Sequence, residues 1–322
     1  MSIPVIDLTA ALTPGAARSA EVAAAIRQAA MHTGFFYIRN HGVAAEQVAR
    51  QFALAAELMA VPESSKQVLS VLNSADMRGY ETTGAQTLDA NAHPDVKESF
   101  QCGMEYPAEH PYALAGYHGY GPSQWPAEVP HAKAQCAQYS AEMLRLSCRL
   151  MQLIALSLGL DEHHFDADCI DPMVSLRMIR YPMHPADADE RTFGAGAHTD
   201  WGAVTILAQD QHGGLEVRLP NGSWAPATPI EGTFVVNLGD MIPRWTNDLY
   251  LSTLHRVRNV HSGGQPRYSI PFFFEPHFLA RIEALPGTVP AGEQPRYASC
   301  TSGEHLVEMY HRTYGVQQAA NA

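Results

Sequence analysis

The sequence predicts an α+β protein in which helices come first and a β-rich second half forms a sandwich or barrel. Three segments before residue 160 place apolar residues at helical spacing, and the longest covers residues 132–158. After residue 170 the spacing changes to strand-like alternation in short runs separated by turns. No stretch has the composition of a linker, so we expect the two halves to form one compact unit.

The first half is expected to alternate short strands with helices. Strands are expected at residues 3–8 and 35–38, the second being a run of aromatic and β-branched residues. Helices are expected at residues 19–33 and 48–60. Residues 70–130 are rich in Gly, Pro, Asn and His, and we expect them to form long loops over the core.

The second half is expected to consist of short strands. They are predicted at residues 174–181, 204–207, 215–219, 233–237, 257–260 and 268–274. The sequence Pro220-Asn221-Gly222 predicts a hairpin turn.

Composition and charge limit the classes of function. Of the 322 residues, 46% are hydrophobic and 17% are charged, which is ordinary for a globular protein. The formal net charge of −12, from 21 basic and 33 acidic residues, argues against binding to nucleic acid or to an anionic membrane. The N-terminus lacks the pattern of a signal peptide, and no stretch approaches the roughly 20 apolar residues of a membrane span.

The cysteines indicate a reducing compartment. They are scattered and lack Cys-x-x-Cys spacing: Cys102, Cys136, Cys148, Cys169 and Cys300. We therefore expect free thiols and a cytoplasmic protein, monomeric or homodimeric, whose partner is a small-molecule substrate.

The most informative motif is His198-Thr199-Asp200, followed by His255 and then by Arg267-Tyr268-Ser269. On a strand, side chains at i and i+2 share a face, so His198 and Asp200 are expected to project together. Two His and one carboxylate form the ligand set of non-haem Fe(II) oxygenases. An Arg with a neighbouring hydroxyl suits a carboxylate. Together these residues predict oxidative chemistry.

Other interpretations of the same residues stay open. A His-x-Asp pair alone is weak evidence, because a chain with 16 His contains such pairs by chance. Two His and a carboxylate also bind zinc in some peptidases, although no His-Glu-x-x-His occurs here. A zinc hydrolase and a non-catalytic or metal-free binding protein are therefore alternatives. An oxygen requirement and the binding of one iron per chain distinguish them from an oxygenase.

A series of short motifs follows in one order along the chain. From His198 to Phe273 these are His-Thr-Asp, Gly-Gly-Leu-Glu-Val, Asn-Leu-Gly-Asp, Arg-Trp-Thr-Asn, His-Arg-Val and Arg-Tyr-Ser-Ile-Pro-Phe-Phe. The first half adds Ile-Pro-Val-Ile-Asp-Leu, Gly-Phe-Phe-Tyr, Asn-His-Gly, Arg-Gly-Tyr and Pro-Asp-Val-Lys-Glu. In these motifs nearly the whole chain resembles the isopenicillin-N-synthase-like family of Fe(II)- and 2-oxoglutarate-dependent oxygenases.

The resemblance implies a double-stranded β-helix, a distorted jelly roll, with flanking N-terminal helices. Residues 1–130 correspond to the N-terminal helical and loop region of the family. Residues 131–322 correspond to the long helix and the jelly-roll core. Fe(II) is then expected on His198, Asp200 and His255.

The resemblance also implies a site for 2-oxoglutarate. Arg267 and Ser269 are expected to bind its distal carboxylate, and Tyr181 to add a hydroxyl. Plant members often carry Asn where this chain has Ile179, so that hydrogen bond is missing or replaced.

The reaction implied is oxidation of a small metabolite by O2, with 2-oxoglutarate converted to succinate and CO2. Hydroxylation, desaturation and cyclisation all fit, as does ethylene formation. The penicillin-forming synthase and aminocyclopropane carboxylate oxidase carry Arg-x-Ser without using 2-oxoglutarate. An Fe(II) oxidase that needs no 2-oxoglutarate is therefore a further alternative.

Substrate contacts are expected from N-terminal loops and from strands that face the iron. The candidates are Arg78, Tyr80, Phe100, Arg177 and Trp201. In a regular strand Trp201 points away from the face of Asp200, so a cavity role and a core role are equally open.

Several other residues are expected to be structural. Phe272 and Phe274 share a face and are expected in the core. Residues 237–240 are expected to form a tight turn that supports the strand before His255. Residues 262–264 are expected to form the turn between His255 and Arg267.

Overall fold

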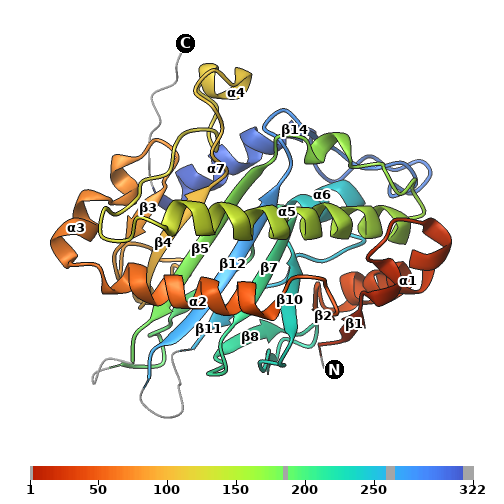
Figure 1. Ribbon diagram of the computed structural model, residues 1–322. Helices are drawn as coiled ribbons and strands as arrows, with labels where there is room; N and C mark the ends of the chain where they lie inside the picture. Colours follow the sequence, from red (N-terminus) through yellow and green to blue (C-terminus); the bar gives the residue numbers. More distant parts are fainter. Residues whose placement is uncertain (1–2, 184–187, 259–264, 315–322) are drawn as a thin grey trace.

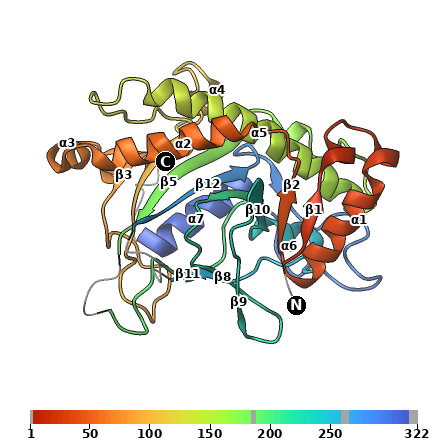
Figure 2. The ribbon, with the colours of Figure 1, turned by 60° about the horizontal axis from the view of Figure 1, so that its bottom comes forward.

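The computed structural model describes residues 3–183, 188–258 and 265–314 (Figure 1). An eight-stranded sheet has the order β1-β2-β10-β7-β12-β5-β4-β3, and a four-stranded sheet has the order β6-β11-β8-β9. The smaller sheet lies against one face of the large one (Figure 2). This confirms the predicted α+β fold with a jelly-roll core.

The strands come from both halves of the chain. The large sheet comprises β1 (Val5–Asp7), β2 (Phe35–Arg39), β3 (Gly79–Glu81), β4 (Glu98–Gly103), β5 (Met173–Tyr181), β7 (Val204–Gln209), β10 (Thr233–Leu238) and β12 (Arg267–Glu275). The smaller sheet comprises β6 (Ala195–His198), β8 (Leu215–Arg218), β9 (Trp224–Pro226) and β11 (His255–Val257). A separate pair is formed by β13 (Arg281–Ile282) and β14 (Cys300–Thr301).

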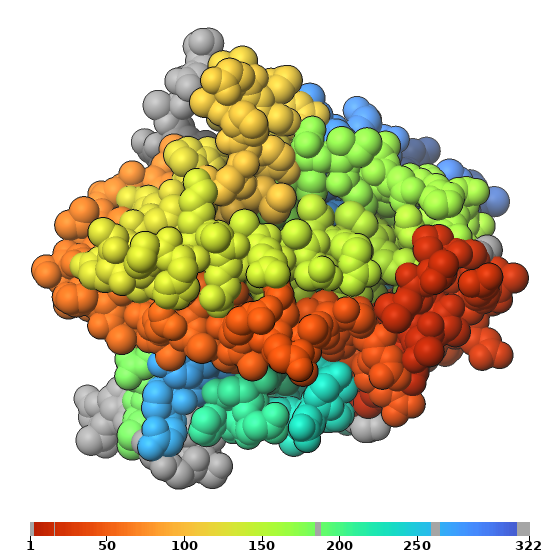
Figure 3. Space-filling model, viewed as in Figure 1, coloured from red at the N-terminus to blue at the C-terminus, as the bar shows by residue number. Residues whose placement is uncertain are grey.

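Helices cover the other face of the large sheet. The described helices are α1 (Ala16–His32), α2 (Ala45–Ala60), α3 (Glu63–Val68), α4 (Pro111–Leu114), α5 (Ala132–Ser157), α6 (Met241–Thr246) and α7 (Ser302–Tyr314). Side chains of α2 and α5 cover the middle of the face seen in Figure 3. In contrast, α7 lies on the side of the smaller sheet (Figure 2). Within the described ranges, no helix combines the length and apolar character needed to cross a membrane.

Two apolar clusters build the core. The larger lies between the helices and the large sheet and includes Ile26, Leu150 and the fully buried Phe272 and Phe274, as predicted for the last two. The smaller joins side chains of the two sheets, among them Tyr181 and Val217. The space between the sheets is therefore only partly filled with apolar side chains, and the remainder is a cavity.

Strand register places the inner-face residues of the large sheet in rows. Arg267 of β12 is paired with Tyr181 of β5. Two residues further along, Ser269 is paired with Ile179 on one side and with Gln209 on the other. Because paired residues of antiparallel strands project to the same face, each row presents its side chains together to the cavity.

The structure departs from the sequence predictions in the region of residues 70–130. The expectation of long loops there is wrong for β3 and β4, which extend one edge of the large sheet. The inner face of β4 carries Ser99, Gln101 and Gly103, and only Phe100 and Cys102 are apolar on the other face, so the alternation is too short to predict a strand clearly. Strands from the first 130 residues thus form both edges of the sheet.

Other predicted elements shift by a few residues. The first helix begins at residue 16, and His255 opens β11 instead of preceding a strand. The predicted hairpin turn joins β8 to β9, and Gly222 in it has a φ of 82°. The expected turn at residues 262–264 lies outside the described residues.

Candidate functional site

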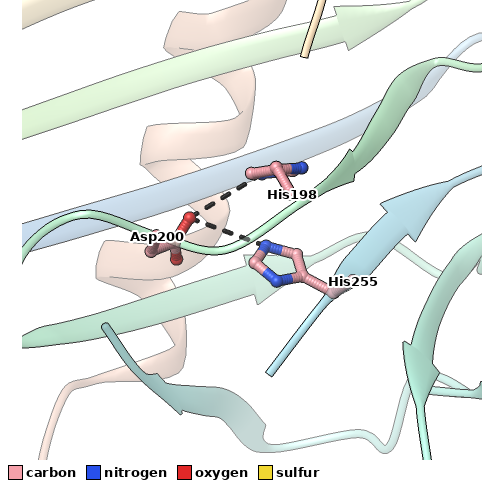
Figure 4. Close-up of side chains that lie close together, drawn as sticks. All are labelled: His198, Asp200 and His255. Atoms are coloured by element: carbon pink, nitrogen blue, oxygen red, sulfur yellow. Dashed lines mark ion pairs between the residues drawn. The ribbon is translucent and has the colours of Figure 1, made fainter. Parts of the chain in front are cut away.

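Two histidines and an aspartate converge between the sheets (Figure 4). His198 is the last residue of β6, and its register partner on β11 is His255. Asp200 Oδ1 lies 3.7 Å from Nε2 of His198 and 3.6 Å from Nε2 of His255. One ligand atom from each residue lies within 4.8 Å of the others. The predicted ligand set is therefore brought together.

The other ring nitrogen of each histidine is held by the backbone. Nδ1 of His198 lies 2.7 Å from the carbonyl oxygen of Gly196, and Nδ1 of His255 lies 3.1 Å from that of Thr253. A carbonyl can only accept, so each Nδ1 carries a proton, and in the neutral ring the lone pair is then on Nε2, which faces Asp200. Burial, together with His255, lowers the pKa of His198 to about 3, which favours the neutral ring.

The carboxylate of Asp200 is fixed by two donors. Its Oδ2 accepts hydrogen bonds from Thr205 Oγ1 at 2.5 Å and from Asn237 Nδ2 at 2.7 Å. Burial alone would raise the pKa of Asp200, but the two histidines and these hydrogen bonds lower it below its ordinary value. The charged form is thus favoured, with Oδ1 left to face the histidines.

The segment that carries Asp200 is not a regular strand. β6 ends at His198, and the backbone N–H of Asp240 then donates to the carbonyl of Asp200 at 2.8 Å. The backbone at Gly239 packs so closely that a Cβ there would lie 2.3 Å from the carbonyl oxygen of Gly202. Gly239 and Asp240 thus support the Asp200 segment, whereas Asn237 and Leu238 of the expected turn belong to β10. Without strand alternation after His198, Trp201 also lines the cavity.

Arg267 lies at one end of the cavity. It is completely buried, and its guanidinium carbon lies 4.7 Å from the ring centroid of Tyr181. Nη2 donates to Gln209 Oε1 at 3.3 Å, whereas Nε and Nη1 have no hydrogen-bond partner among the described residues. A buried cation with unsatisfied donors is costly unless an anion binds there. Ser269 lies in the adjacent row and lines the same cavity.

Of the five expected substrate contacts, three line the cavity and two do not. Arg78, Arg177 and Trp201 line the cavity. Tyr80 and Phe100 are not among the lining residues: Tyr80 donates to Glu98 at 2.6 Å, and the Phe100 ring packs against Trp125. On β4 the residues that line the cavity are Gln101 and Cys102.

Some cavity residues were missed by the sequence predictions. They include Lys97, Gln101, Ser175, Phe273, Glu275 and Tyr310. Burial, together with the charge of Asp200, raises the pKa of Glu275 to about 8. The only sequence signal for Phe273 and Glu275 is that they lie an even number of residues from Arg267 and Ser269, which places all four side chains on one face of a strand.

The donor set fits Fe(II). Two imidazoles and one carboxylate on one side of a cavity leave further coordination positions open, as Fe(II) oxygenases require. The unsatisfied guanidinium donors of Arg267 in the same cavity fit a carboxylate co-substrate. Both groups can thus be accommodated together.

Comparison with known proteins agrees with this geometry. Residues 3–128 match the family model of the N-terminal region of non-haem dioxygenases in morphine synthesis. Residues 171–276 match that of the 2-oxoglutarate–Fe(II) oxygenase superfamily. The chain belongs to this superfamily.

Individual relatives extend the match over the full chain. The 2-oxoglutarate–Fe(II) type oxidoreductase hxnY of Emericella nidulans is 35% identical, over 98% of this chain and 91% of that protein. A Neurospora crassa protein solved in full length with 2-oxoglutarate and thymine is 31% identical and covers 96% of each chain, with a TM-score of 0.85. JOX2 in complex with 2-oxoglutarate, iron and JA is 26% identical, with a TM-score of 0.78, and covers 99% of this chain and 88% of that one.

The protein is therefore an Fe(II)- and 2-oxoglutarate-dependent dioxygenase that oxidises a small organic molecule. Fe(II) is its metal, and 2-oxoglutarate and O2 are its co-substrates. This agrees with the function predicted from the sequence, in preference to the zinc hydrolase, the 2-oxoglutarate-independent oxidase and the non-catalytic protein.

Proposed function

We propose that His198, Asp200 and His255 hold the Fe(II), and that Arg267, Ser269 and Tyr181 hold the distal carboxylate of 2-oxoglutarate. One observation carries this assignment: the convergent donor set and the unsatisfied guanidinium of Arg267 line the same cavity. When bound, the iron supplies oxygen activation, in which 2-oxoglutarate is converted to succinate and CO2 and the substrate is oxidised.

The residues of the chain provide orientation. Arg267 fixes one end of 2-oxoglutarate, so that its keto acid end can reach the three ligands in one direction only. The hydrogen bonds of Thr205 and Asn237 hold Asp200 in place before the metal binds. Ile179, paired with Ser269, offers no side-chain hydrogen bond, so the polar contacts of this site come from Ser269 itself and from the neighbouring row of Arg267 and Tyr181.

The substrate is proposed to be a small organic molecule bound beyond the ligand set. The Neurospora crassa protein binds thymine and JOX2 binds JA, which shows that related cavities accept compact molecules. Arg78, Arg177 and Trp201 are the predicted contacts retained, because all three line the cavity. Hydroxylation, desaturation and cyclisation all fit this site, since each can begin with loss of hydrogen from a C–H bond that faces the metal.

The cellular compartment and the kind of partner are proposed from the composition of the chain. All five cysteines are free, which fits a reducing cytoplasm. The net charge of −12 favours a small-molecule partner over nucleic acid.

Oxygen uptake tests the proposal. The purified protein with Fe(II) should consume O2 and release succinate only when 2-oxoglutarate is present. Asp200→Ala should abolish both, because a single carboxylate completes the ligand set. Equal oxygen uptake without 2-oxoglutarate, or full activity of the Asp200→Ala variant, would refute the assignment.

A further inference from the structure

The cavity continues beyond the ligand set, away from Arg267. Along the inner face of β12, Arg267 is followed at intervals of two by Ser269, Pro271, Phe273 and Glu275. Thr205, which holds Asp200, is paired with Phe273. The end of the cavity near Glu275 is therefore separated from Arg267 by the metal ligands. If Arg267 binds 2-oxoglutarate as proposed, this end is left for the primary substrate, and we call it the substrate half.

Each of the other cations that line the cavity has a partner, although Nε of Arg177 makes no hydrogen bond to a described residue. Arg177 forms an ion pair with Glu81 and donates to Ser99 at 3.0 Å. Lys97 lies 2.6 Å from Asp95.

Arg78, the remaining cation, is hydrogen-bonded to backbone carbonyl oxygens. Arg78 donates to the carbonyl oxygens of Met104 at 3.1 Å and Gly119 at 2.6 Å, and also to that of Gly121. Every Arg or Lys among the described residues that line the substrate half therefore already has a partner, so this half is poorly suited to binding a substrate carboxylate.

Several polar side chains that line the cavity lack hydrogen-bond partners, and three of them lie on neighbouring strands of the substrate half. Gln101 is 8% exposed and Glu275 is 7% exposed, and neither side chain hydrogen-bonds to another described residue. The hydroxyl of Ser175 is buried and also lacks a partner among those residues. Buried polar groups are rarely left unsatisfied, so these three indicate a polar ligand.

These side chains lie on a diagonal across three neighbouring strands. Ser175 of β5 is paired with Gly103 of β4 and with Phe273 of β12. Gln101 lies two residues before Gly103, and Glu275 lies two residues after Phe273. The amide, the hydroxyl and the carboxyl group therefore border one continuous strip of the cavity wall.

The surroundings of this strip are aromatic. The rings of Trp201 and Tyr310 meet edge to face, with centroids 5.1 Å apart. Tyr310 of α7 also contacts the ring of His118 at 4.6 Å, and Phe273 lines the cavity beside Glu275. At Gly202, a Cβ would lie 2.7 Å from Oε1 of Glu275, so this glycine leaves room for the carboxyl group beside the Asp200 segment.

We propose that the primary substrate is a small, uncharged ring compound with a cyclic amide edge, recognised by Glu275 and Ser175. Its N–H donates to the carboxyl oxygen of Glu275, and its carbonyl oxygen accepts from the hydroxyl of Ser175, with Gln101 at the far end of the strip. The aromatic side chains pack against the ring. This inference rests on the proposed function, since it needs Arg267 to be occupied by 2-oxoglutarate.

Equilibrium binding under anaerobic conditions tests the inference without turnover. The full-length protein is loaded with Mn(II) and 2-oxoglutarate and titrated calorimetrically with 2-pyridone, uracil, N-methyl-2-pyridone and benzoate. We expect 2-pyridone or uracil to bind, and N-methylation to weaken binding about tenfold or more. Benzoate should bind less tightly than the cyclic amides.

Variants then locate the contact. Glu275→Leu should weaken binding of the cyclic amide by about tenfold or more, and should leave the affinity for the N-methyl compound unchanged. Glu275→Gln, which keeps an acceptor oxygen, should lose less. The control Glu283→Gln alters an exposed carboxylate paired with Arg281 and should change nothing. Affinity for 2-oxoglutarate should stay within twofold in all three variants.

The results distinguish failure of this inference from failure of the proposed function. The inference is overturned if benzoate binds best, if Glu275→Leu leaves cyclic amide binding intact, or if no cyclic amide binds while Mn(II) and 2-oxoglutarate do. If Mn(II) and 2-oxoglutarate themselves fail to bind, the proposed function fails, and the inference that depends on it fails too.

Discussion

Nδ2 of Asn237 lies 2.7 Å from Oδ2 of Asp200, and the two residues belong to different parts of the fold. Asn237 is in β10 of the large sheet, whereas Asp200 follows β6 of the smaller sheet. This hydrogen bond ties the two sheets together at the ligand set. It also directs the remaining oxygen of the carboxylate toward His198 and His255.

Loss of this hydrogen bond should weaken metal binding. In Asn237→Leu, Asp200 keeps only the Thr205 donor of the two, so its carboxylate is less firmly oriented. We expect the affinity for Mn(II) or Fe(II) to fall about 10- to 100-fold. Anaerobic calorimetry measures this, with Asn91→Leu, at an exposed asparagine, as the matched control. An unchanged affinity would show that Asn237 does not position the ligand.

Arg267 should control affinity for 2-oxoglutarate more than catalysis at saturation. Arg267→Met removes a buried charge whose Nε and Nη1 await an anion. We expect the dissociation constant for 2-oxoglutarate to rise about 30-fold or more. The affinity for metal should change little, since Arg267 is not among the three ligand residues. Arg281→Met, at an exposed arginine, is the control. Normal 2-oxoglutarate affinity in Arg267→Met would remove this residue from the anion site.

The shape of the aromatic end of the cavity should determine how closely the conversion of 2-oxoglutarate is coupled to oxidation of the substrate. Tyr310 of α7 contacts the rings of Trp201 and His118 and lines the cavity. Tyr310→Ala should leave the affinity for 2-oxoglutarate within about twofold while lowering the ratio of oxidised product to succinate, because the substrate is less well oriented. Comparing succinate with product tests this. An unchanged ratio would place Tyr310 outside the substrate site.

Stability should depend on Glu98 in a pH-dependent way. Its carboxylate accepts hydrogen bonds from Tyr80 and Arg180 at 2.6 Å and from Lys66 at 3.1 Å. Burial raises the pKa of Glu98, but these partners outweigh it and hold the pKa below the ordinary 4.5. The stabilisation is therefore complete above pH 4.5 and is lost as the pH falls through the lower pKa of the folded state.

Glu98→Gln tests this dependence. At pH 7 the variant should lose roughly 3 kcal/mol of unfolding free energy, because two cations lose a buried partner. The difference from the wild type should shrink as the pH falls below 4.5. Urea unfolding across pH measures it, with Glu283→Gln as an exposed control that should lose less than about 1 kcal/mol. A difference that is constant with pH would contradict the role of the charge.

Two of the three candidate metal ligands have a local sequence signal. His198 and Asp200 are two residues apart, whereas His255 comes from a different strand. Arg267 and Ser269, the candidate anion site, likewise share a strand. The structure shows that β6 ends at His198, so the strand alternation that directs Trp201 away from Asp200 does not apply there, and Trp201 lines the cavity.

The substrate half could not be predicted because it depends on register between distant strands. Gln101, Ser175 and Glu275 come from β4, β5 and β12, and no sequence pattern fixes how these strands align. Tyr80 and Phe100 were expected to contact substrate, and instead they pack against Glu98 and Trp125. A shift of one residue along β4 exchanges the cavity face for the opposite face.

Anaerobic titration of 2-oxoglutarate into the protein, with and without Fe(II), tests the central claim most directly. If the Fe(II) on the three ligand residues binds one end of 2-oxoglutarate and Arg267 binds the other, a single 2-oxoglutarate should bind per chain. Binding should be at least tenfold tighter with Fe(II) than without it, and Asp200→Ala should abolish this difference. An affinity that is the same with and without the metal would contradict the account.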